Sequence, residues 1–359
     1  MRKNPGLSHP RLVVETFIAT RLLLFATALY VSWQGWALDV VFQNWDAAHY
    51  LGIAANGYAD EQSLAFFPGW PWLISTLAKT GIPLVWAGVA LALVFSALAV
   101  AALYRLYGSR AAIAWTLAPM AVFTLAPYTE SMFCAAAFWA WERAKAKQWW
   151  AAGLLAGIAM TTRVSGLFLI GALFILAVSQ GGQVAEFFRR IFWLIIPVAV
   201  LAGYLVFVHE KTGRWDGWFS VQQTYWTRGW AWPWESLGHT IEAATPGYFP
   251  GNDANSYVFM LEIVSWGIGL LVAVAALLRR QWAESAWVAV QVLAFSLSYW
   301  LMSVVRAVLL WFPAFGQLGD LLGRIPERPR RWVSGVLAAL ALVWQVLWAW
   351  TFFTGKWAG

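Results

Sequence analysis

Charged residues are scarce in this chain. Only 11% of its 359 residues are Asp, Glu, Lys or Arg, whereas 61% are hydrophobic. A soluble domain of this size carries a far larger charged fraction. Apolar runs of about 15 to 22 residues recur along the whole length, and a helix needs about 20 residues to span the hydrocarbon core of a bilayer. The composition therefore predicts an all-α polytopic membrane protein, with residues 1–359 forming a single integral membrane domain.

Cysteine and histidine are also rare. The single cysteine, Cys134, excludes an internal disulfide and a cysteine-based zinc site. Among the four histidines, His209 and His239 could join Glu210 and Glu242 in a metal cluster, but their spacing is not that of metal ligands. We therefore expect no metal and no other cofactor. The net charge of +7 lies in short clusters rather than in a stripe, which favours the lipid bilayer over nucleic acid as a partner.

Apolar segments alternate with basic connections. We expect about 11 transmembrane helices, at roughly 12–33, 84–104, 111–126, 128–141, 148–162, 164–179, 191–209, 257–278, 283–302, 305–322 and 332–353. The basic clusters fall in every second connection, as the positive-inside rule requires. The basic start, with Arg2 and Lys3, and an apolar run to Trp33 suit an uncleaved first helix with a cytoplasmic N-terminus. Two long segments, 34–82 and 210–256, then lie on the extracytoplasmic side of the cell membrane.

The most informative stretch is NWDAAHYLGIAANGY, which begins at Asn44. Asn44 is a plausible N-cap of a short helix that ends at Gly57. On such a helix Asp46 and His49 lie one turn apart on one face, with Tyr50 beside them. The helix dipole keeps Asp46 ionised and able to accept a proton. The alternative is that Asp46 only makes a local hydrogen bond, but a polar cluster beside a membrane favours a functional role.

This stretch, followed by FFPGWP at Phe66 to Pro71, resembles the first loop of the mannosyltransferase family named after phosphatidylinositol-glycan class V (PIG-V), particularly its bacterial members. Similar segments follow in the same order: APYTESMF at 126–133, TRVSG at 162–166, the spaced Gln222, Tyr225 and Trp226, and SVVRAVLLWFP at 303–313. The resemblance implies a GT-C fold with a helical first extracytoplasmic loop at 34–82. It also makes Asp46 the expected catalytic base. The usual Arg-Tyr pair of the late segment is Arg306-Ala307 here.

The same resemblance implies the reaction. Members of the family transfer mannose from a polyprenyl-phosphate donor to an acceptor on the non-cytoplasmic face, with inversion of the anomeric centre. Such a donor already carries its leaving group, so the enzyme must deprotonate a hydroxyl and stabilise the departing phosphate, without a nucleotide or a metal. The acceptor remains open between a glycan, a glycolipid and a protein. The sugar itself could also be another polyprenyl-linked hexose or pentose.

Basic residues outside the cytoplasmic clusters are candidates for holding the donor phosphate. Arg163 and Arg306 are expected near the outer membrane face, where a charge is costly unless it is paired or faces a cavity. The guanidinium fork matches phosphate oxygens. Alternatively, both side chains extend to lipid headgroups or pair with a carboxylate such as Glu130. Arg228 is the reserve candidate, and His49 either contacts the phosphate or supports Asp46.

Five further residues are expected to bind substrate. They are Trp45, Tyr50, Tyr128, Glu130 and Gln222. A few tryptophans near Asp46 could stack on sugar faces, whereas most of the 28 belong to the membrane interface. Glu130 follows Pro127 and Tyr128 at a helix start, where capping is the alternative to substrate binding.

Two other functions remain open. A transporter or flippase for a lipid-linked sugar also has many helices, but such proteins usually show paired halves and ionisable groups at the bilayer midplane. A glycoside hydrolase needs two cooperating carboxylates, for which only Asp60 and Glu61 could support Asp46.

Overall fold

The computed structural model describes residues 9–358, so the basic start at Arg2 and Lys3 lies outside the described residues. The helices in chain order are α1 (Pro10–Trp33), α2 (Leu38–Val41), α3 (Asp46–Asn56), η1 (Gln62–Ala65), α4 (Gly69–Ala78), α5 (Leu84–Tyr107), α6 (Ser109–Thr116), η2 (Ala121–Thr124), α7 (Glu130–Lys145), α8 (Trp149–Met160), α9 (Ser165–Ser179), α10 (Val184–Phe192), α11 (Ile195–Thr212), α12 (Gly217–Trp226), α13 (Pro233–Ala243), α14 (Asp253–Leu278), α15 (Trp282–Ser296), α16 (Val304–Ala307), η3 (Val308–Leu310), α17 (Phe312–Arg324) and α18 (Glu327–Phe353). Within this range the only β interaction is a bridge between Trp230 and Ser298. The predicted all-α fold is confirmed.

Five helical segments of the described chain are long and apolar enough to cross a membrane: α1, α5, α10 with α11, α14 and α18. A sixth is added if the 304–310 and 312–324 helices, which meet at a 72° bend, form one broken span. The expected number of 11 is therefore not confirmed. The expected 111–126 span divides into α6 and η2, because Pro119 cannot donate a backbone hydrogen bond and its ring clashes with the preceding turn.

The core of the bundle is organised around α7, which is buried on nearly all sides. Small residues, including Ala136, Ala137 and Ala140, are almost completely inaccessible and allow α5 and α8 to pack closely on both sides of α7. Trp141 and Phe312 fill the space beside them, with ring centroids 4.9 Å apart. Because neighbouring protein covers α7, this helix does not need the length of a lipid-facing span.

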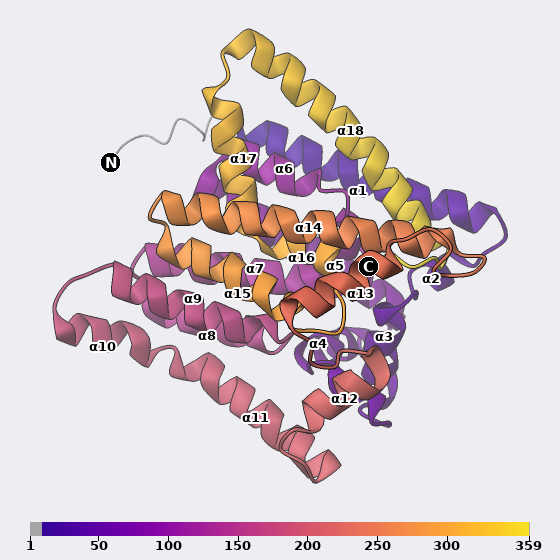
Figure 1. Ribbon diagram of the computed structural model, residues 1–359, viewed down its shortest axis with the longest axis horizontal. Coiled ribbons are helices and arrows are strands. Elements are labelled where there is room, and N and C mark those ends of the chain that lie inside the picture. Colours follow the sequence, from indigo (N-terminus) through magenta and orange to yellow (C-terminus); the bar gives the residue numbers. More distant parts are fainter. Residues whose placement is uncertain (1–8, 359) are drawn as a thin grey trace.

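The connections gather at two ends of the bundle. The long segments 34–82 and 210–256 lie at one end, at the right of Figure 1, where α2, α3 and α13 are labelled. Trp218, in the second segment, donates from its indole nitrogen to the carbonyl of Ala65, in the first segment. At the other end, ion pairs join three of the predicted basic connections to neighbouring helices: Arg105–Glu142, Lys145–Glu284 and Arg279–Asp320. Connections predicted to share one side of the membrane thus lie together.

The first long segment is largely helical, as predicted, and glycine fixes its position. Gly69, at the start of α4, donates its backbone N–H to the carbonyl of Thr161 at 2.8 Å. A Cβ atom at Gly69 would lie 2.1 Å from the Thr161 hydroxyl, so only glycine allows this approach. The contact joins the FFPGWP segment to Thr161, the residue directly before the TRVSG segment, at the end of the bundle that carries α3.

Candidate active site

The start of α3 is held by the end of α18. Helix α3 begins at Asp46, but the predicted N-cap is wrong: Trp45 occupies this position with φ of 58°. Asn44 instead donates from its side-chain amide to the carbonyl of Phe352 at 2.9 Å, because the 44–45 backbone packs on the C-terminal helix. The Trp45 indole donates to the carbonyl of Lys356 at 3.0 Å. A non-glycine residue with positive φ is strained and persists only where the surroundings fix it. These contacts therefore place Asp46 firmly.

Asp46 forms an ion pair with Arg306, at a distance of 2.6 Å between Oδ2 and the guanidinium Nη1. The Arg306 and Asp46 side chains are only 10% and 19% exposed. Tyr128 supports both residues, because its hydroxyl accepts the backbone N–H of Asp46 at 3.1 Å and its ring lies 5.5 Å from the Arg306 guanidinium carbon. Segments from three distant parts of the sequence thus meet at one carboxylate.

The pKa of Asp46 reports the balance of burial and charge. Burial acts to raise this pKa, but the charge and hydrogen bond of Arg306 outweigh it, and Arg228 and His49 act in the same direction. The pKa of Asp46 therefore lies below its usual value, and the side chain is ionised at neutral pH. An ionised, positioned carboxylate can accept a proton from a hydroxyl that approaches it.

A second ion pair lies beside the first. Glu130, the first residue of α7, accepts a 2.8 Å hydrogen bond from Arg163, and its side chain is only 1% exposed. The same carboxylate oxygen is 3.8 Å from Nε of Arg306. The sequence left capping open as a role for Glu130, but Glu130 shows no capping hydrogen bond within the described residues. It also left open a pairing of Arg163 with Glu130, and the structure shows this pair. Glu130 Oε2 and Arg306 Nε have no hydrogen-bond partner among the described residues. The cluster therefore has one buried acceptor and one buried donor that are unsatisfied.

Arg228 approaches the cluster from the end of α12. It follows Thr227, which has left-handed backbone geometry, and its backbone N–H donates to the carbonyl of Gln222 at 3.2 Å. Its guanidinium donates to the Ser303 hydroxyl at 3.4 Å. Burial, and then repulsion from Arg306, lower the pKa of Arg228 to about 10. The Arg228 side chain therefore remains charged at neutral pH, although burial disfavours the charge.

Aromatic residues complete one side of the site. His49 stacks on Phe66 with ring centroids 4.9 Å apart, and Trp226 lies 5.7 Å from the His49 ring. The Tyr50 hydroxyl is 3.4 Å from the Thr129 hydroxyl, and burial raises the pKa of Tyr50, so it stays protonated. The predicted neighbours of Asp46 on α3 are thus at the cluster.

Two predicted substrate contacts lie at its edge. The indole of Trp45 points to the C-terminal segment, and Trp45 is 47% exposed. Gln222 contributes its carbonyl to the position of Arg228, whereas its side chain makes no hydrogen bond within residues 9–358. Asp60, a possible second carboxylate, accepts the backbone N–H of Ser63 at 2.7 Å. The structure therefore gives Asp60 a local role at the start of η1.

Sequence reasoning missed Glu262 and Ser303. Glu262 lies in α14, is completely buried, and accepts the backbone N–H of Ser303 at 2.8 Å. Its signal was present, because it is the only acidic residue between Asp253 and Glu284, and an acidic side chain within an apolar span is a functional candidate by default.

No group of three or more His, Cys, Asp or Glu side chains that could hold a metal ion occurs in the part of the chain that the structure describes. His209 stacks on Trp215, with centroids 4.1 Å apart, whereas the His239 ring nitrogen lies 2.8 Å from the Tyr299 carbonyl. The two histidines considered for a metal cluster thus serve separate contacts.

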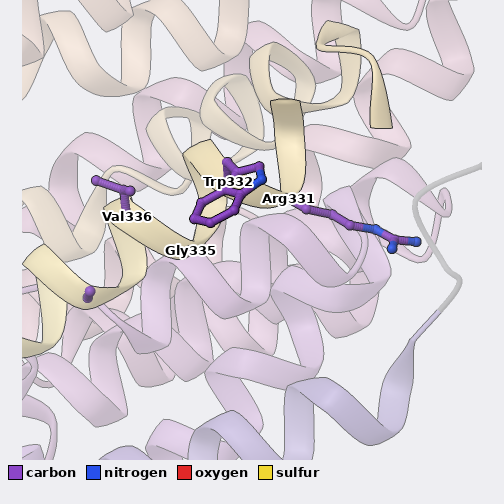
Figure 2. A pocket seen from close by; sticks show the side chains of 5 residues that line it. Arg331, Trp332, Gly335 and Val336 are labelled. Carbon is purple, nitrogen blue, oxygen red and sulfur yellow. The ribbon is translucent and has the colours of Figure 1, made fainter. Parts of the chain in front are cut away.

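Two hollows lie away from the Asp46 cluster. Figure 2 shows one of about 400 Å³ beside Arg331, Trp332 and Gly335, at the start of α18. Its last lining residue, Ala339, lies 13 residues before Phe352, which is about 20 Å along a helix. A groove of about 620 Å³ lies on the opposite face of α3 from Asp46, between α2, α3 and the start of α5. Neither hollow is lined by Asp46, Glu130, Arg163 or Arg306, so the cluster that these four residues form remains the candidate active site.

The fold is similar to that of a solved structure. The crystal structure of ArnT from Cupriavidus metallidurans bound to undecaprenyl phosphate aligns with 93% of this chain and 69% of that chain, with a TM-score of 0.53 and 16% identity. The fold is that of the GT-C glycosyltransferases.

The family model of the PIG-V mannosyltransferases matches residues 18–190. GPI alpha-1,6-mannosyltransferase 2 of Mus musculus is 34% identical over 148 residues, and GPI mannosyltransferase 2 of Schizosaccharomyces pombe is 30% identical over 152 residues. These alignments cover 36% and 39% of this chain, and 30% and 31% of the relatives. Residues 18–190 of the chain are therefore similar to the PIG-V mannosyltransferase family. Only about a third of the length of these relatives is matched. The range matched by the family model, 18–190, includes Asp46, Glu130 and Arg163.

Proposed function

We propose that the protein is an inverting mannosyltransferase that moves mannose from polyprenyl-phosphate-mannose to an acceptor hydroxyl, with Asp46 as the general base. The observation that carries this proposal is the Asp46–Arg306 pair, which places an ionised carboxylate beside guanidinium groups at one end of a membrane bundle. A base and a phosphate-binding group are the two functions that this transfer requires.

The reaction balances with these residues alone. The acceptor oxygen attacks the anomeric carbon from the face opposite the phosphate, while Asp46 takes the hydroxyl proton. The bond between the anomeric carbon and the phosphate oxygen breaks, and its electron pair leaves with the polyprenyl phosphate. Arg306, with Arg163 and Arg228, stabilises the charge that develops on this oxygen. A β-linked donor then gives an α-mannoside.

The pairing of Arg306 with Asp46 suggests how the donor prepares the site. Arg306 Nε makes no hydrogen bond among the described residues, and Arg228 Nε is also unsatisfied and buried. A phosphate that enters here gains these donors and competes with Asp46 for the Arg306 fork. Release of Asp46 from this pair then makes it a stronger base when the acceptor arrives.

The comparisons support the choice of sugar and carrier. The matched relatives are named GPI mannosyltransferases, which favours mannose over another hexose. The ArnT structure that shares the fold contains undecaprenyl phosphate, which favours a polyprenyl-phosphate donor. The transporter interpretation gains no support from these matches, all of which are to glycosyltransferases.

We place the reaction on the extracytoplasmic face of the cell membrane, with the N-terminus in the cytoplasm. Asp46 and Arg228 belong to the segments 34–82 and 210–256, at the end of the bundle opposite the ion-paired basic connections. His49, Tyr50 and Tyr128 lie around Asp46, and with Trp45 at the edge of the cluster they are candidates for sugar and acceptor contacts. A glycan, a glycolipid or a protein hydroxyl could serve as the acceptor, because each supplies the same nucleophilic oxygen.

The test uses purified full-length protein in proteoliposomes with a panel of polyprenyl-phosphate sugars and membrane extracts as the acceptor source. We expect radiolabelled mannose to move into an extractable product whose anomeric carbon is α, as determined by NMR or by linkage-specific mannosidases. Transfer from a nucleotide sugar in the absence of polyprenyl carriers would contradict the proposal, as would a β-mannoside product.

A further inference from the structure

Glu262 is the most deeply buried carboxylate near the cluster. It lies in α14 with no exposed surface, and its two oxygens accept the backbone N–H groups of Ser303 at 2.8 Å and Val305 at 2.9 Å. Across residues 9–358 no basic side chain forms an ion pair with it. Both carboxylate oxygens are therefore devoted to one short stretch of backbone.

That stretch needs such support. Ser303 adopts a φ of 67°, a left-handed conformation that costs free energy for a residue with a side chain. The N–H groups that follow it begin the short helix α16 and have no carbonyl partners in a preceding turn. A buried N–H without a partner is costly, so an external acceptor is required. Glu262 supplies two acceptors at once and stabilises this bend.

The bend in turn orients two arginines of the site. The Ser303 hydroxyl is 3.2 Å from a terminal guanidinium nitrogen of Arg306 and 3.4 Å from one of Arg228. Arg306 lies three residues after Ser303, so its Cα position depends directly on the geometry of the bend.

We infer that Glu262 is a positioning residue for the transfer reaction: through the 303–305 backbone and the Ser303 hydroxyl it directs Arg306 and Arg228 towards the phosphate of the lipid donor. This inference rests on the proposed function. Glu262 itself touches neither donor nor acceptor. Its loss therefore affects the donor side of the reaction, whereas recognition of the acceptor stays intact.

The matched variants are Glu262→Gln and Glu284→Gln. Gln at position 262 retains one acceptor oxygen but turns an NH₂ group towards a backbone N–H. Glu284 is also buried and pairs with Lys145 at the opposite end of the bundle, so it controls for the loss of a buried carboxylate. For Glu262→Gln we expect binding of polyprenyl phosphate and kcat/KM for the donor to fall about tenfold or more, with the acceptor KM unchanged. For Glu284→Gln we expect any loss to be confined to thermal stability.

A double-mutant cycle separates positioning from general stability. If Glu262 acts through Arg306, the fall in kcat/KM for the donor in the double variant is smaller than the product of the falls in Glu262→Gln and Arg306→Ala. If the two residues act independently, the two fold-changes multiply. Ser303→Ala, which keeps the backbone and removes the shared hydroxyl, serves if Glu262→Gln fails to fold, and it should also weaken polyprenyl phosphate binding. Wild-type protein that does not bind polyprenyl phosphate overturns the proposed function. If the wild type binds polyprenyl phosphate and Glu262→Gln binds it with equal affinity, the role of Glu262 is overturned while the proposed function stands. Ser303→Ala takes the place of Glu262→Gln if only Ser303→Ala folds. Multiplicative effects in the cycle likewise overturn the role of Glu262 without affecting the proposed function.

Discussion

Arg306 donates a 2.6 Å hydrogen bond to Asp46 across 260 residues of sequence, and this contact defines the electrostatics of the candidate site. The pair keeps the carboxylate ionised despite its burial. It also restrains the carboxylate, because an oxygen bonded to a guanidinium is a weaker base. The catalytic power of Asp46 and the position of Arg306 are therefore coupled, and substitutions at either residue should affect both.

Asp46→Asn keeps the shape of the side chain and removes its basicity. General base catalysis typically contributes about 10² to 10⁴ in rate, so we expect kcat to fall by this factor while the protein remains folded in detergent. The measurement is the initial rate of mannose transfer in proteoliposomes, together with size-exclusion chromatography of the purified variant.

Asp39→Asn is the matched control, because Asp39 lies in the same segment, is exposed, and is on the far side of α3. We expect its rate to equal that of the wild type. Near-normal turnover of Asp46→Asn with an alcohol acceptor would show that the base lies elsewhere.

Arg306→Lys and Arg306→Ala test the phosphate-binding role. Lysine keeps the charge but loses the fork that matches two phosphate oxygens. We therefore expect kcat/KM for the donor to fall in Arg306→Lys and to fall further in Arg306→Ala, with the acceptor KM little changed. Each step should be worth about tenfold in kcat/KM for the donor. Arg214→Ala is the control, because Arg214 is exposed and, among residues 9–358, forms its ion pair with Asp216 alone. Unchanged donor kinetics in both Arg306→Ala and Arg163→Ala would direct the search to His49 and Arg228.

The pH dependence follows from the lowered pKa of Asp46. A carboxyl group with a depressed pKa contributes stability above its unfolded pKa of about 3.9, and this contribution is lost as the pH falls through the folded value. Activity of the wild type should therefore not be limited by Asp46 until the pH drops below about 4. In Arg306→Ala the charge and hydrogen bond that lower the pKa of Asp46 are lost, so burial raises this pKa. The acidic limb of the profile should therefore move to higher pH. Profiles of kcat/KM with coincident acidic limbs would argue against Asp46 as the titrating base.

Local patterns in the sequence predicted much of this site. The NWDAAHYLGIAANGY stretch predicts a short helix between an N-cap at Asn44 and Gly57, and the structure places α3 at Asp46–Asn56. The cost of charge near a membrane predicted that Arg163 and Arg306 need partners, and Glu130 was among those considered. These predictions succeeded because helix ends and isolated charges have local signatures.

The parts that failed depend on contacts between distant residues. Asn44 looked like an N-cap, but its amide bonds to Phe352, a partner 308 residues away. Glu262 gave no reason to be matched with Ser303 until the fold brought α14 and the 303–305 bend together. The expected number of 11 spans is not confirmed for the same reason: α7 has only 16 residues and is covered by neighbouring helices, and burial of this kind cannot be read from its hydropathy.

Chelation tests the absence of a metal from the mechanism. Because guanidinium groups can neutralise the departing phosphate, we expect transfer to proceed at the wild-type rate in excess EDTA. The measurement is the initial rate before and after chelation, with and without added Mg²⁺ or Mn²⁺. Loss of activity in EDTA with recovery in a divalent ion would indicate a metal bound near Asp46, Asp60 and Glu61.

Arg163 has two candidate roles, and its partner Glu130 separates them. Glu130 is 1% exposed and accepts its short hydrogen bond from Arg163. Removal of one member of a buried pair leaves an uncompensated charge, which typically costs about 3–5 kcal/mol, so Arg163→Ala should lower the melting temperature in detergent. Glu130→Gln combined with Arg163→Ala removes the stranded charge and should recover much of that stability.

Donor kinetics of the double variant then decide whether Arg163 also binds phosphate. If Arg163 only neutralises Glu130, restoring neutrality in the double variant should return the donor KM towards the wild-type value. If Arg163 contacts the donor phosphate, the donor KM should stay elevated by about tenfold even though the melting temperature has recovered. We expect the second result, because Arg163, Arg306 and Glu130 form one connected group in which Glu130 Oε1 lies 2.8 Å from one guanidinium and 3.8 Å from the other. A phosphate drawn to Arg306 therefore arrives within reach of Arg163, and a donor KM that recovers together with stability would assign Arg163 to structure alone.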